Sequence, residues 1–269
     1  MPEGHVIHRL ARRFTEAFAG RPVAAVSPQG RFSEGAALLH GQPMLEAEAH
    51  GKHLFAGFPA GWLHVHLGLY GKFAWGEPPA PAPVGQIRLR LVGGQAYCDL
   101  RGPAACELLT PGEKDALHAR LGPDPLRPDA DPERAWAKIS RSGQPVSALL
   151  MDQKVVSGVG NIYRAEVLFR HRIDPRRAGK DLTRAQWKAI WADLVELMAD
   201  GVEAGRIDTV RPEHTPEAMG RPPRVDAHGG EVYVYRRAGL PCLVCGLAVR
   251  TENLQARNLF WCPGCQDRP

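Results

Sequence analysis

The spacing of apolar residues changes along the chain and separates an N-terminal part from a C-terminal one. Residues 5–19, HVIHRLARRFTEAFA, repeat apolar side chains every three or four positions, which predicts one amphipathic helix that ends at Gly20. From about Val23 to Leu109, short apolar runs such as HLFAGFP and QIRLRLV are separated by Gly and Pro turns. This pattern predicts antiparallel strands, and we expect them to form a β-sandwich.

The segment after the expected sandwich marks a boundary. Residues 121–134, LGPDPLRPDADPER, contain so many prolines and aspartates that neither helix nor strand should persist there. Helical spacing follows, and its last helix begins with a capping-box signature at Thr183 and Gln186. Residues 206–230 contain four prolines without a clear period, so we expect a flexible loop. The run VYVYRRAGLPC after this loop predicts a strand.

The composition is that of a folded protein with a moderate excess of positive charge. Of the 269 residues, 44% are hydrophobic and 23% are charged, values that are typical of globular proteins and exclude a disordered chain. The net charge of +5 suits a polyanionic partner without requiring one. No apolar run is long enough to span a membrane and the N-terminus lacks a signal-peptide pattern, so we expect a cytoplasmic protein with no membrane association.

Two C-x-x-C pairs near the C-terminus predict a metal site. The pairs are Cys242 with Cys245 and Cys262 with Cys265, separated by sixteen residues. Four cysteines at this spacing leave no open position for water, so we expect one structural Zn²⁺ per chain, with iron in a rubredoxin-like site as the alternative. The zinc would hold a hairpin that is too small to fold alone. Arg257 lies on this hairpin, although its spacing fits a solvated surface arginine equally well.

The remaining cysteines and several histidines have simpler interpretations. Cys98 and Cys106 lie outside the two pairs and are expected to be buried thiols. His64 and His66 would point to one face of a strand, and two ligands without a third predict packing or hydrogen bonding rather than metal binding. We expect His5 on the surface of the first helix.

A glycine pair precedes one of the predicted helices. In DQKVVSGVGNIYRAE, Gly158 and Gly160 stand just before Asn161, which has the character of an N-cap residue. Backbone amides at such a site bind phosphate well, and Lys154 adds a cation. The glycines fit a tight turn between two helices equally well, and the segment is no Walker loop because no G-K-[ST] follows.

Five motifs, in the same order and over nearly the whole chain, resemble the formamidopyrimidine-DNA glycosylase and endonuclease VIII family. They are MPEG at the start, GKHLF at 51–55, LGPDPL at 121–126, DQKVVSGVGNIYRAEVLF at 152–169 and the terminal C-x2-C…FWCPGCQ. PEGH and FWCPGCQ look closer to the endonuclease VIII branch, especially its actinobacterial-type members. The resemblance implies an α+β multidomain protein with an N-terminal helix and antiparallel β-sandwich, a helix-two-turn-helix domain and a C-terminal four-cysteine zinc finger hairpin.

The resemblance also assigns a role to each segment. We expect the catalytic β-sandwich domain at 1–120, a linker at 121–133, the helix-two-turn-helix DNA-binding domain at 134–230 and the zinc finger at 231–269. Double-stranded DNA containing damaged bases or abasic sites would lie in the cleft between the domains. We expect a monomer in the bacterial cytoplasm, associated with the nucleoid.

The catalytic residues implied by the resemblance begin at the N-terminus. Removal of Met1 would leave Pro2 with a free secondary amine. A generic α-amino group is about 10% neutral at pH 7, against under roughly 0.1% for an ordinary lysine. Pro2 would attack C1′ of the damaged nucleotide and form an iminium, and elimination of the 3′ and then the 5′ phosphate would follow. Glu3 would supply the proton that opens the deoxyribose ring, and Lys52 would contact the flanking phosphate and assist elimination.

The same motifs imply residues that contact DNA. Arg257, counted with the catalytic set, and Asn161 would grip the phosphates around the lesion, and Lys154 would lie near the same backbone. Leu69 and Tyr70 would wedge into the gap that the flipped nucleotide leaves.

Two positions depart from the patterns of the family. Gly68 replaces a glutamine found in typical endonuclease VIII, which weakens the assignment of opposite-base reading. Arg101 aligns with an arginine of the formamidopyrimidine-type D-P-R-R-F-G motif, which implies a contact with DNA, but Pro103 replaces the phenylalanine of that motif. A buried arginine at a strand end is an equally good interpretation of Arg101.

The sequence therefore predicts a base excision repair enzyme that is both a DNA glycosylase and an apurinic lyase. Its substrates would be oxidised bases, with pyrimidines favoured, and its reaction would end in β,δ-elimination. The alternative is a protein that binds damaged or abasic DNA with little or no base excision. The joint presence of Pro2, Glu3 and Lys52 argues against this alternative.

Overall fold

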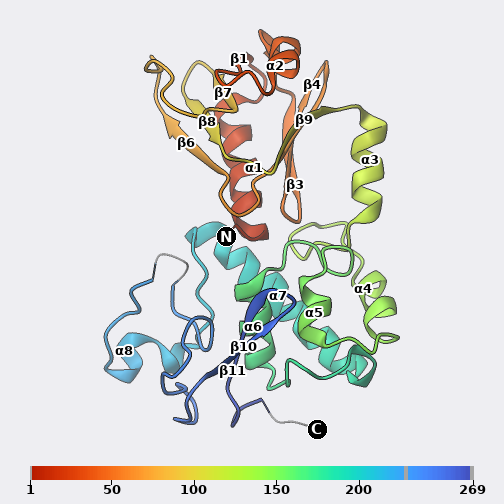
Figure 1. Ribbon diagram of the computed structural model, residues 1–269, viewed down its shortest axis with the longest axis vertical. Helices are drawn as coiled ribbons and strands as arrows, with labels where there is room; N and C mark the ends of the chain where they lie inside the picture. Colours follow the sequence, from red (N-terminus) through yellow and green to blue (C-terminus); the bar gives the residue numbers. More distant parts are fainter. Residues whose placement is uncertain (1, 227–229, 267–269) are drawn as a thin grey trace. The chain divides into compact units, whose positions relative to one another are not determined.

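A computed structural model describes residues 2–226 and 230–266, and these form two compact units that meet in sequence between Arg120 and Leu121. Unit 1 contains α1 (Gly4–Phe18), β1 (Pro22–Val26), α2 (Ser33–Leu39), β2 (Gln42–Pro43), β3 (Glu46–His50), β4 (His53–Phe58), β5 (Gly61–His66), β6 (Lys72–Gly76), β7 (Leu89–Val92), β8 (Tyr97–Arg101), β9 (Ala105–Leu109) and α3 (Pro111–Arg120) (Figure 1). Unit 2 contains α4 (Pro132–Ile139), α5 (Val146–Met151), α6 (Asn161–Arg170), the 3-10 turn η1 (Gly179–Asp181), α7 (Arg184–Ala204), η2 (Pro212–His214), α8 (Pro216–Met219), β10 (Arg250–Leu254) and β11 (Arg257–Trp261). No helix in the described ranges is both long and apolar enough to cross a membrane.

Unit 1 is the β-sandwich that the alternating pattern predicted. One sheet has the strand order β2-β1-β7-β8-β6 and the other has the order β3-β4-β5-β9, with every pairing antiparallel. Helix α1 buries Ile7, Phe14 and Phe18 in the same apolar core as the two sheets. The helix begins after Glu3, and its C-cap Ala19 stands just before Gly20 at φ +73°, close to the end that the sequence predicted.

Unit 2 is built around α5, α6 and α7. The capping box predicted for α7 is present, since Thr183 accepts from the backbone of Gln186 and the Gln186 side chain accepts from the backbone of Thr183. The buried face of α7 includes Trp187 and Leu194, which pack into one core with α6. Apolar periodicity therefore predicted the helical core correctly.

Strands β10 and β11 form a hairpin near the C-terminus. Leu254 pairs with Arg257 across a two-residue turn in which Gln255 has φ 50° and Ala256 has φ 59°. Positive φ at both central residues is the geometry of a type I′ turn, which matches the twist of a two-stranded hairpin. Neither residue is glycine, so periodicity and turn propensity did not mark this turn in the sequence.

The strand predicted from VYVYRRAGLPC is absent, because a buried carboxylate takes its backbone hydrogen bonds. The N–H groups of Tyr233, Val234 and Tyr235 donate to the Glu166 carboxylate at 2.7, 2.9 and 2.8 Å. The Thr209 hydroxyl donates to the same carboxylate at 2.7 Å. Glu166 lies on α6 and is fully buried, so this segment wraps around a side chain instead of pairing with a strand.

Two loop segments are more ordered than the sequence suggested. Residues 121–125, which begin the expected linker, are all buried, and Gly122 leaves no room for a side chain against the carbonyl of Val155. The expected loop at 206–230 contains η2 and α8 within its described residues, and residues 227–229 lie outside them. Proline at the first turn of each of these short helices agrees with their form.

Candidate functional site

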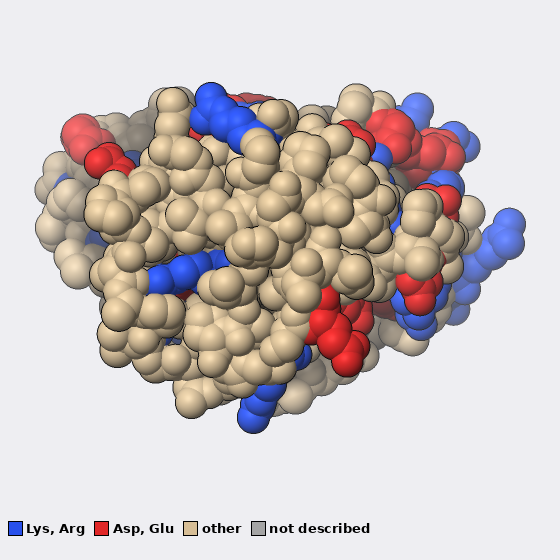
Figure 2. Space-filling model, turned by 90° about the horizontal axis from the view of Figure 1, so that it is seen from above, with Lys and Arg blue, Asp and Glu red and all other residues tan. Residues whose placement is uncertain are grey.

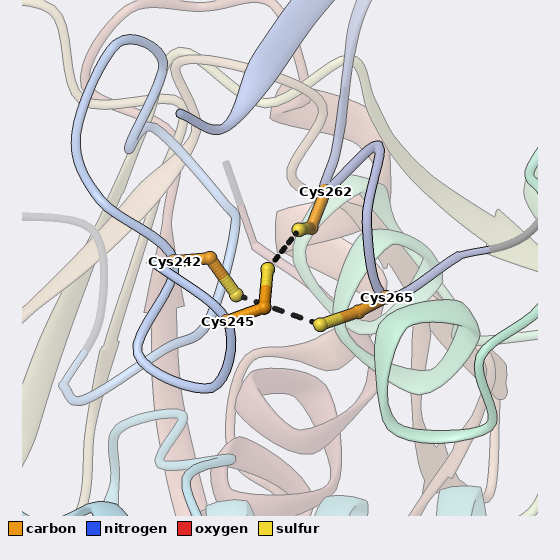
Figure 3. A group of neighbouring side chains, drawn as sticks. All are labelled: Cys242, Cys245, Cys262 and Cys265. Atoms are coloured by element: carbon orange, nitrogen blue, oxygen red, sulfur yellow. Dashed lines mark hydrogen bonds between the residues drawn. The ribbon is translucent and has the colours of Figure 1, made fainter. Parts of the chain in front are cut away.

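The four paired cysteines lie together in unit 2, as the sequence predicted. The Sγ atoms of Cys242 and Cys265 are 3.8 Å apart and those of Cys245 and Cys262 are 3.3 Å apart, with all four sulfurs within 4.8 Å of one another (Figure 3). A tetrahedral S4 zinc site with Zn–S bonds of about 2.3 Å separates its sulfurs by about 3.8 Å. The donor set and its spacing therefore fit a closed four-coordinate site.

The cysteine cluster is tied to the core of unit 2 by Gln266, a residue that sequence reasoning missed. Its side-chain oxygen accepts from the N–H of Cys262 at 2.9 Å, and its amide donates to the carbonyl of Ile173 at 2.9 Å. Gln266 is almost fully buried. Second-sphere hydrogen bonds of this kind fix the orientation of metal ligands. The signal available in the sequence was a glutamine directly after the last cysteine.

The hairpin β10–β11 places Arg257 beside the first turn of α6. The Asn161 amide donates to the carbonyl of Asn258 at 3.0 Å, and the guanidinium of Arg164 donates to the same carbonyl at 3.1 Å. Arg164 also donates to the side-chain oxygen of Asn161. Because Asn258 follows Arg257 directly, these bonds bring two of the predicted phosphate-contacting residues into one neighbourhood.

Asn161 is the first residue of α6 and not its N-cap, which corrects the sequence prediction. The N-cap is Gly160, with φ −124° and ψ −158°, and no side chain caps the helix. The Asn161 side chain is instead held by Asn258 and Arg164, which explains why it does not turn back onto the helix backbone. Arg164 is fully buried, and sequence reasoning gave it no role.

The glycine loop before α6 is held in place by Gln153. The Gln153 amide donates to the carbonyls of Met151 and Val159 at 3.0 and 2.9 Å, and its oxygen accepts from the N–H of Gly158 at 3.0 Å. Gly158 has φ +87°, a conformation that glycine adopts readily. Lys154 is exposed on the same segment. The loop is thus a preformed turn with a cation at its edge.

In unit 1, three predicted site segments lie at one end of the sandwich. The β3–β4 turn contains Lys52, and the loop that begins after His66 lies at the same sheet end because His66 pairs with His53. The C-terminal end of α1 meets Met44, just before β3 begins, so the first turn of α1 lies toward the Lys52 turn (Figure 1). The fold therefore gathers the N-terminus, the Lys52 turn and the 67–71 loop.

The predicted catalytic pair starts α1. Pro2 is partly exposed, whereas Glu3 is 1% exposed and forms the N-cap position of the helix. The carbonyl of Glu3 accepts from the N–H of Val6 at 3.0 Å, which fixes the backbone at the helix start. A fully buried carboxylate at the N-terminal end of a helix is an uncommon arrangement.

The wedge residues predicted in the 67–71 loop are exposed. Leu69 is 51% exposed and Tyr70 is 85% exposed, which makes them two of the large apolar side chains that the core does not use. Gly68 has φ +67°, and a Cβ there would lie 2.8 Å from the Cβ of Ala104. The positive φ and the close approach of Ala104 therefore favour glycine at this position.

Arg101 lies at the end of β8 and is anchored within unit 1. Its guanidinium donates to the carbonyl of Val84 at 2.7 Å and contacts the Asp99 carboxylate at 3.4 Å. Asp99 is held mainly by the buried Arg90, at 2.6 and 2.8 Å. These contacts fit the interpretation of Arg101 as a strand-end arginine with structural bonds, while its side chain keeps 31% exposure.

The structure confirms some of the predictions made for the histidines and for the two cysteines outside the C-x-x-C pairs, and it corrects others. His5 is buried and not on the helix surface, and burial lowers its pKa to about 4. His64 is a hydrogen-bonding residue, as predicted. Cys98 is fully buried, and burial raises its pKa, whereas Cys106 is partly buried with a pKa raised to about 12 by the same cause.

On the face shown in Figure 2, uncharged side chains predominate, and the Lys and Arg side chains drawn there stand singly or beside acidic ones. The net charge of +5 is therefore not concentrated on this face. A phosphate-binding surface requires a denser arrangement of cations.

Three family models match successive parts of the chain. The N-terminal domain of formamidopyrimidine-DNA glycosylase matches residues 1–106, the H2TH domain of the same enzyme matches residues 121–212, and the zinc finger found in FPG and IleRS matches residues 239–268. The first match includes Pro2, Glu3 and Lys52, and the last includes the four paired cysteines.

Relatives and solved structures agree with these matches. The chain is 52% identical over 274 residues to Endonuclease 8 1 of Mycobacterium tuberculosis, which covers 99% of this chain and 100% of that relative. It is 33% identical over 283 residues to Probable endonuclease 8 2 of Streptomyces coelicolor, with 100% and 95% covered. The Lactococcus lactis Fpg in complex with DNA containing an abasic site has the same fold, with a TM-score of 0.80, 22% identity and 99% and 100% covered. The chain therefore belongs to the formamidopyrimidine-DNA glycosylase and endonuclease VIII family of DNA repair enzymes.

Proposed function

We propose that this protein is a bifunctional DNA glycosylase and apurinic lyase that removes oxidised bases, pyrimidines by preference, from double-stranded DNA. The observation that carries the proposal is the gathering of the Pro2–Glu3 helix start, the Lys52 turn and the exposed Leu69–Tyr70 loop at one end of unit 1. A nucleophile, a buried acid, a cation and an apolar wedge are the groups that this reaction needs.

The reaction begins at the secondary amine of Pro2, which removal of Met1 exposes. The nitrogen lone pair attacks C1′ of the flipped nucleotide, and the bond between C1′ and the base breaks. Glu3 gives a proton to the ring oxygen, so the deoxyribose opens and a cationic iminium forms between Pro2 and C1′. The base leaves with the electron pair of its glycosidic bond and takes up the proton that the Pro2 nitrogen loses as the iminium forms.

The iminium then serves as an electron sink for strand cleavage. Loss of a proton from C2′ expels the 3′ phosphate, and loss of a second proton expels the 5′ phosphate, which is β,δ-elimination. Lys52 contacts the flanking phosphate and stabilises the departing charge. Hydrolysis of the iminium returns the free amine of Pro2 and releases the unsaturated sugar aldehyde.

The other predicted residues hold the DNA. Arg257 and Asn161 grip the phosphates around the lesion, with Lys154 near the same backbone. Leu69 and Tyr70 fill the space of the flipped nucleotide, at a cost of about a few kcal/mol in unstacking that new contacts offset. Arg101 lies near this loop in the structure, since Gly102 packs against Tyr70 and Arg101 pairs with Lys72. We assign Arg101 a supporting role in the placement of the loop.

The cysteine cluster holds one structural Zn²⁺ per chain in this proposal. Cys242, Cys245, Cys262 and Cys265 supply all four ligands, so no position is left for a reacting water. The zinc fixes the hairpin that presents Arg257. We also propose that the protein acts as a monomer in the bacterial cytoplasm, on chromosomal DNA.

A borohydride trapping experiment tests the proposed chemistry. A duplex with an abasic site or thymine glycol is incubated with the protein and sodium borohydride, and the products are separated on a denaturing gel. We expect a covalent protein–DNA adduct that is lost in Pro2→Gly and when Met1 is retained. Glu3→Gln should keep most of the binding affinity while base excision falls by at least about a hundredfold.

The second candidate is a protein that binds damaged or abasic DNA without excision. It would give tight binding with neither an adduct nor a nicked strand. The buried Glu3 next to Pro2 favours the enzyme, because a binding protein gains nothing from a buried carboxylate beside DNA phosphates.

A further inference from the structure

One face of the four-stranded sheet in unit 1 carries an unusual set of polar side chains. Strand alternation and the registers of β3, β4, β5 and β9 place these polar residues on one face, together with Phe55 and Trp62: Glu48, His50, His53, His64, His66 and Glu107. The opposite face of the same strands carries residues such as Leu54, Leu63 and Val65, which belong to the sandwich core. The polar face therefore does not serve the sandwich core.

Three of these residues form a continuous hydrogen-bonded chain. Nδ1 of His64 lies 2.8 Å from a carboxylate oxygen of Glu107, and Nε2 of His64 lies 2.8 Å from Nδ1 of His53. The His64 side chain is 4% exposed, whereas that of Glu107 is 53% exposed. The chain thus runs from a solvated carboxylate on β9, through a buried imidazole on β5, to an imidazole on β4.

The carboxylate fixes the tautomer of both imidazoles. A carboxylate only accepts, so Nδ1 of His64 must carry the proton and its Nε2 must accept when the ring is neutral. Nδ1 of His53 must then donate to His64, which leaves Nε2 of His53 with its lone pair. Burial first, and then His64, His66, His50 and His118, lower the pKa of His53 to about 3, so this ring is neutral near pH 7.

The hydrogen-bonded chain reaches the β3–β4 turn, which contains Lys52. His50 and His53 pair with each other and close this turn, and His66 pairs with His53 on the other side. The ring centroids of His53 and His66 are 4.8 Å apart. Lys52 directly precedes His53, the first residue of β4, which pairs with His66. Burial first, and then His64 and Lys52, lower the pKa of His66.

Helix α3 covers the same face but contacts it at other residues. Lys114 forms an ion pair with Glu48 and lies 3.4 Å from the ring centroid of Trp62. His118 packs against Phe55 and His50, with ring centroids 4.8 and 4.9 Å apart. The packing of α3 can therefore be disturbed at Lys114 without breaking a bond of the chain.

We propose that the chain Glu107, His64 and His53 positions Lys52 for the elimination step. The proposal rests on the role given to Lys52 in the proposed function. The hydrogen-bonded chain holds His53 in one orientation at the base of the β3–β4 turn. This fixes the position of the turn, and hence of the Lys52 ammonium group, relative to the sheet.

Two rates measured on one abasic-site duplex test this inference. The first is formation of the borohydride-trapped adduct, which needs Pro2, and the second is strand cleavage without borohydride, which also needs Lys52. In His64→Phe we expect the ratio of cleavage to trapping to fall about tenfold, because small displacements of a catalytic group have effects of this size or larger. Trapping itself should stay within about twofold of the unaltered protein.

Glu107 provides a second pair of variants at an exposed position where folding is not at risk. Glu107→Leu removes the acceptor for His64, so it should lower the same ratio. Glu107→Gln keeps an oxygen that accepts from Nδ1 of His64, and its ratio should stay within about threefold of the unaltered protein. Lys114→Met is the matched control, because it disturbs α3 while it leaves the chain intact. It should lower the melting temperature without changing the ratio.

The outcomes separate this inference from the proposed function. A normal ratio in His64→Phe and Glu107→Leu, together with a low ratio in Lys52→Ala, would overturn the chain as a positioning device and leave the role of Lys52 in place. An equal fall of the ratio of cleavage to trapping in Lys114→Met would show that the packing of α3 sets this ratio. That result would also overturn the inference. A normal ratio in Lys52→Ala would reject both, and absence of any adduct would reject the proposed chemistry itself.

Discussion

Arg257 stands directly after the tight turn of the zinc hairpin, where its side chain is only partly buried. If it contacts a DNA phosphate, Arg257→Ala should weaken binding to all sequences by a similar factor and reduce the slope of log affinity against log salt by about one. Fluorescence anisotropy over a salt series measures both quantities. Arg250→Ala is the matched control, since Arg250 is exposed on the neighbouring strand of the same hairpin. An unchanged slope in Arg257→Ala would count against the phosphate contact.

Buried neutral histidines should make the stability of this protein depend on pH. Burial lowers the folded-state pKa of His5 to about 4, below the value of about 6.5 expected in the unfolded chain. The unfolded state therefore binds more protons below pH 6.5, so the contribution of His5 is fully present above that pH and is lost as the pH falls toward 4. Melting temperatures between pH 7.5 and 4.5 should fall, and His5→Leu should fall less steeply. A variant profile parallel to that of the unaltered protein would contradict this.

Glu166 is the clearest case in which one side chain decides the form of a whole element. Its two oxygens accept four hydrogen bonds, three of them from the backbone at 233–235. Glu166→Gln would turn a donating amide toward two of these donors, so it should destabilise unit 2 by about 2–4 kcal/mol. Denaturant unfolding followed by fluorescence measures the loss. Glu196→Gln, at an exposed position on α7, should stay within about 0.5 kcal/mol of the unaltered protein.

The sequence predicted an element correctly where a local apolar periodicity determines it. The prediction failed where side chains from distant parts of the sequence determine the backbone conformation. The alternation in β4 and β5 and the helical spacing of α7 are local patterns, and both elements formed as predicted. The run VYVYRRAGLPC at 232–242 also has a strand-like pattern, but its backbone N–H groups at 233–235 donate to Glu166, 67 or more positions earlier. Asn161 has N-cap character, yet the carbonyl of Asn258 claims its side chain. No local pattern records such long-range partners.

The candidate site shows the same division. The four cysteines were predictable because their spacing alone defines a metal site, and the exposed pair Leu69 and Tyr70 followed from a motif. Gln266, Arg164 and the Glu107–His64–His53 chain were not predictable, because each depends on a register or contact between separate elements.

Across the whole molecule, we expect the metal to control DNA binding through the hairpin. Removal of zinc with a chelator, or Cys262→Ser, should abolish high-affinity binding because the β10–β11 hairpin loses the bonds that hold its base. Unit 1 has its own core and should remain folded, so limited proteolysis should cut unit 2 first. Metal analysis should give about one zinc per chain, and Cys106→Ser should keep it. Full DNA affinity in a zinc-free protein would contradict the prediction.

The turn between β10 and β11 has a further consequence for engineering. Gln255 and Ala256 both occupy left-handed backbone conformations, which cost an L-residue about 1 kcal/mol or more each relative to glycine. Asparagine followed by glycine is the pair best suited to such a turn. Gln255→Asn with Ala256→Gly should raise the melting temperature of the hairpin. The strand register, and hence the position of Arg257, should not change. Two substitutions in this turn should thus increase thermal stability without changing the residues that take part in binding or catalysis.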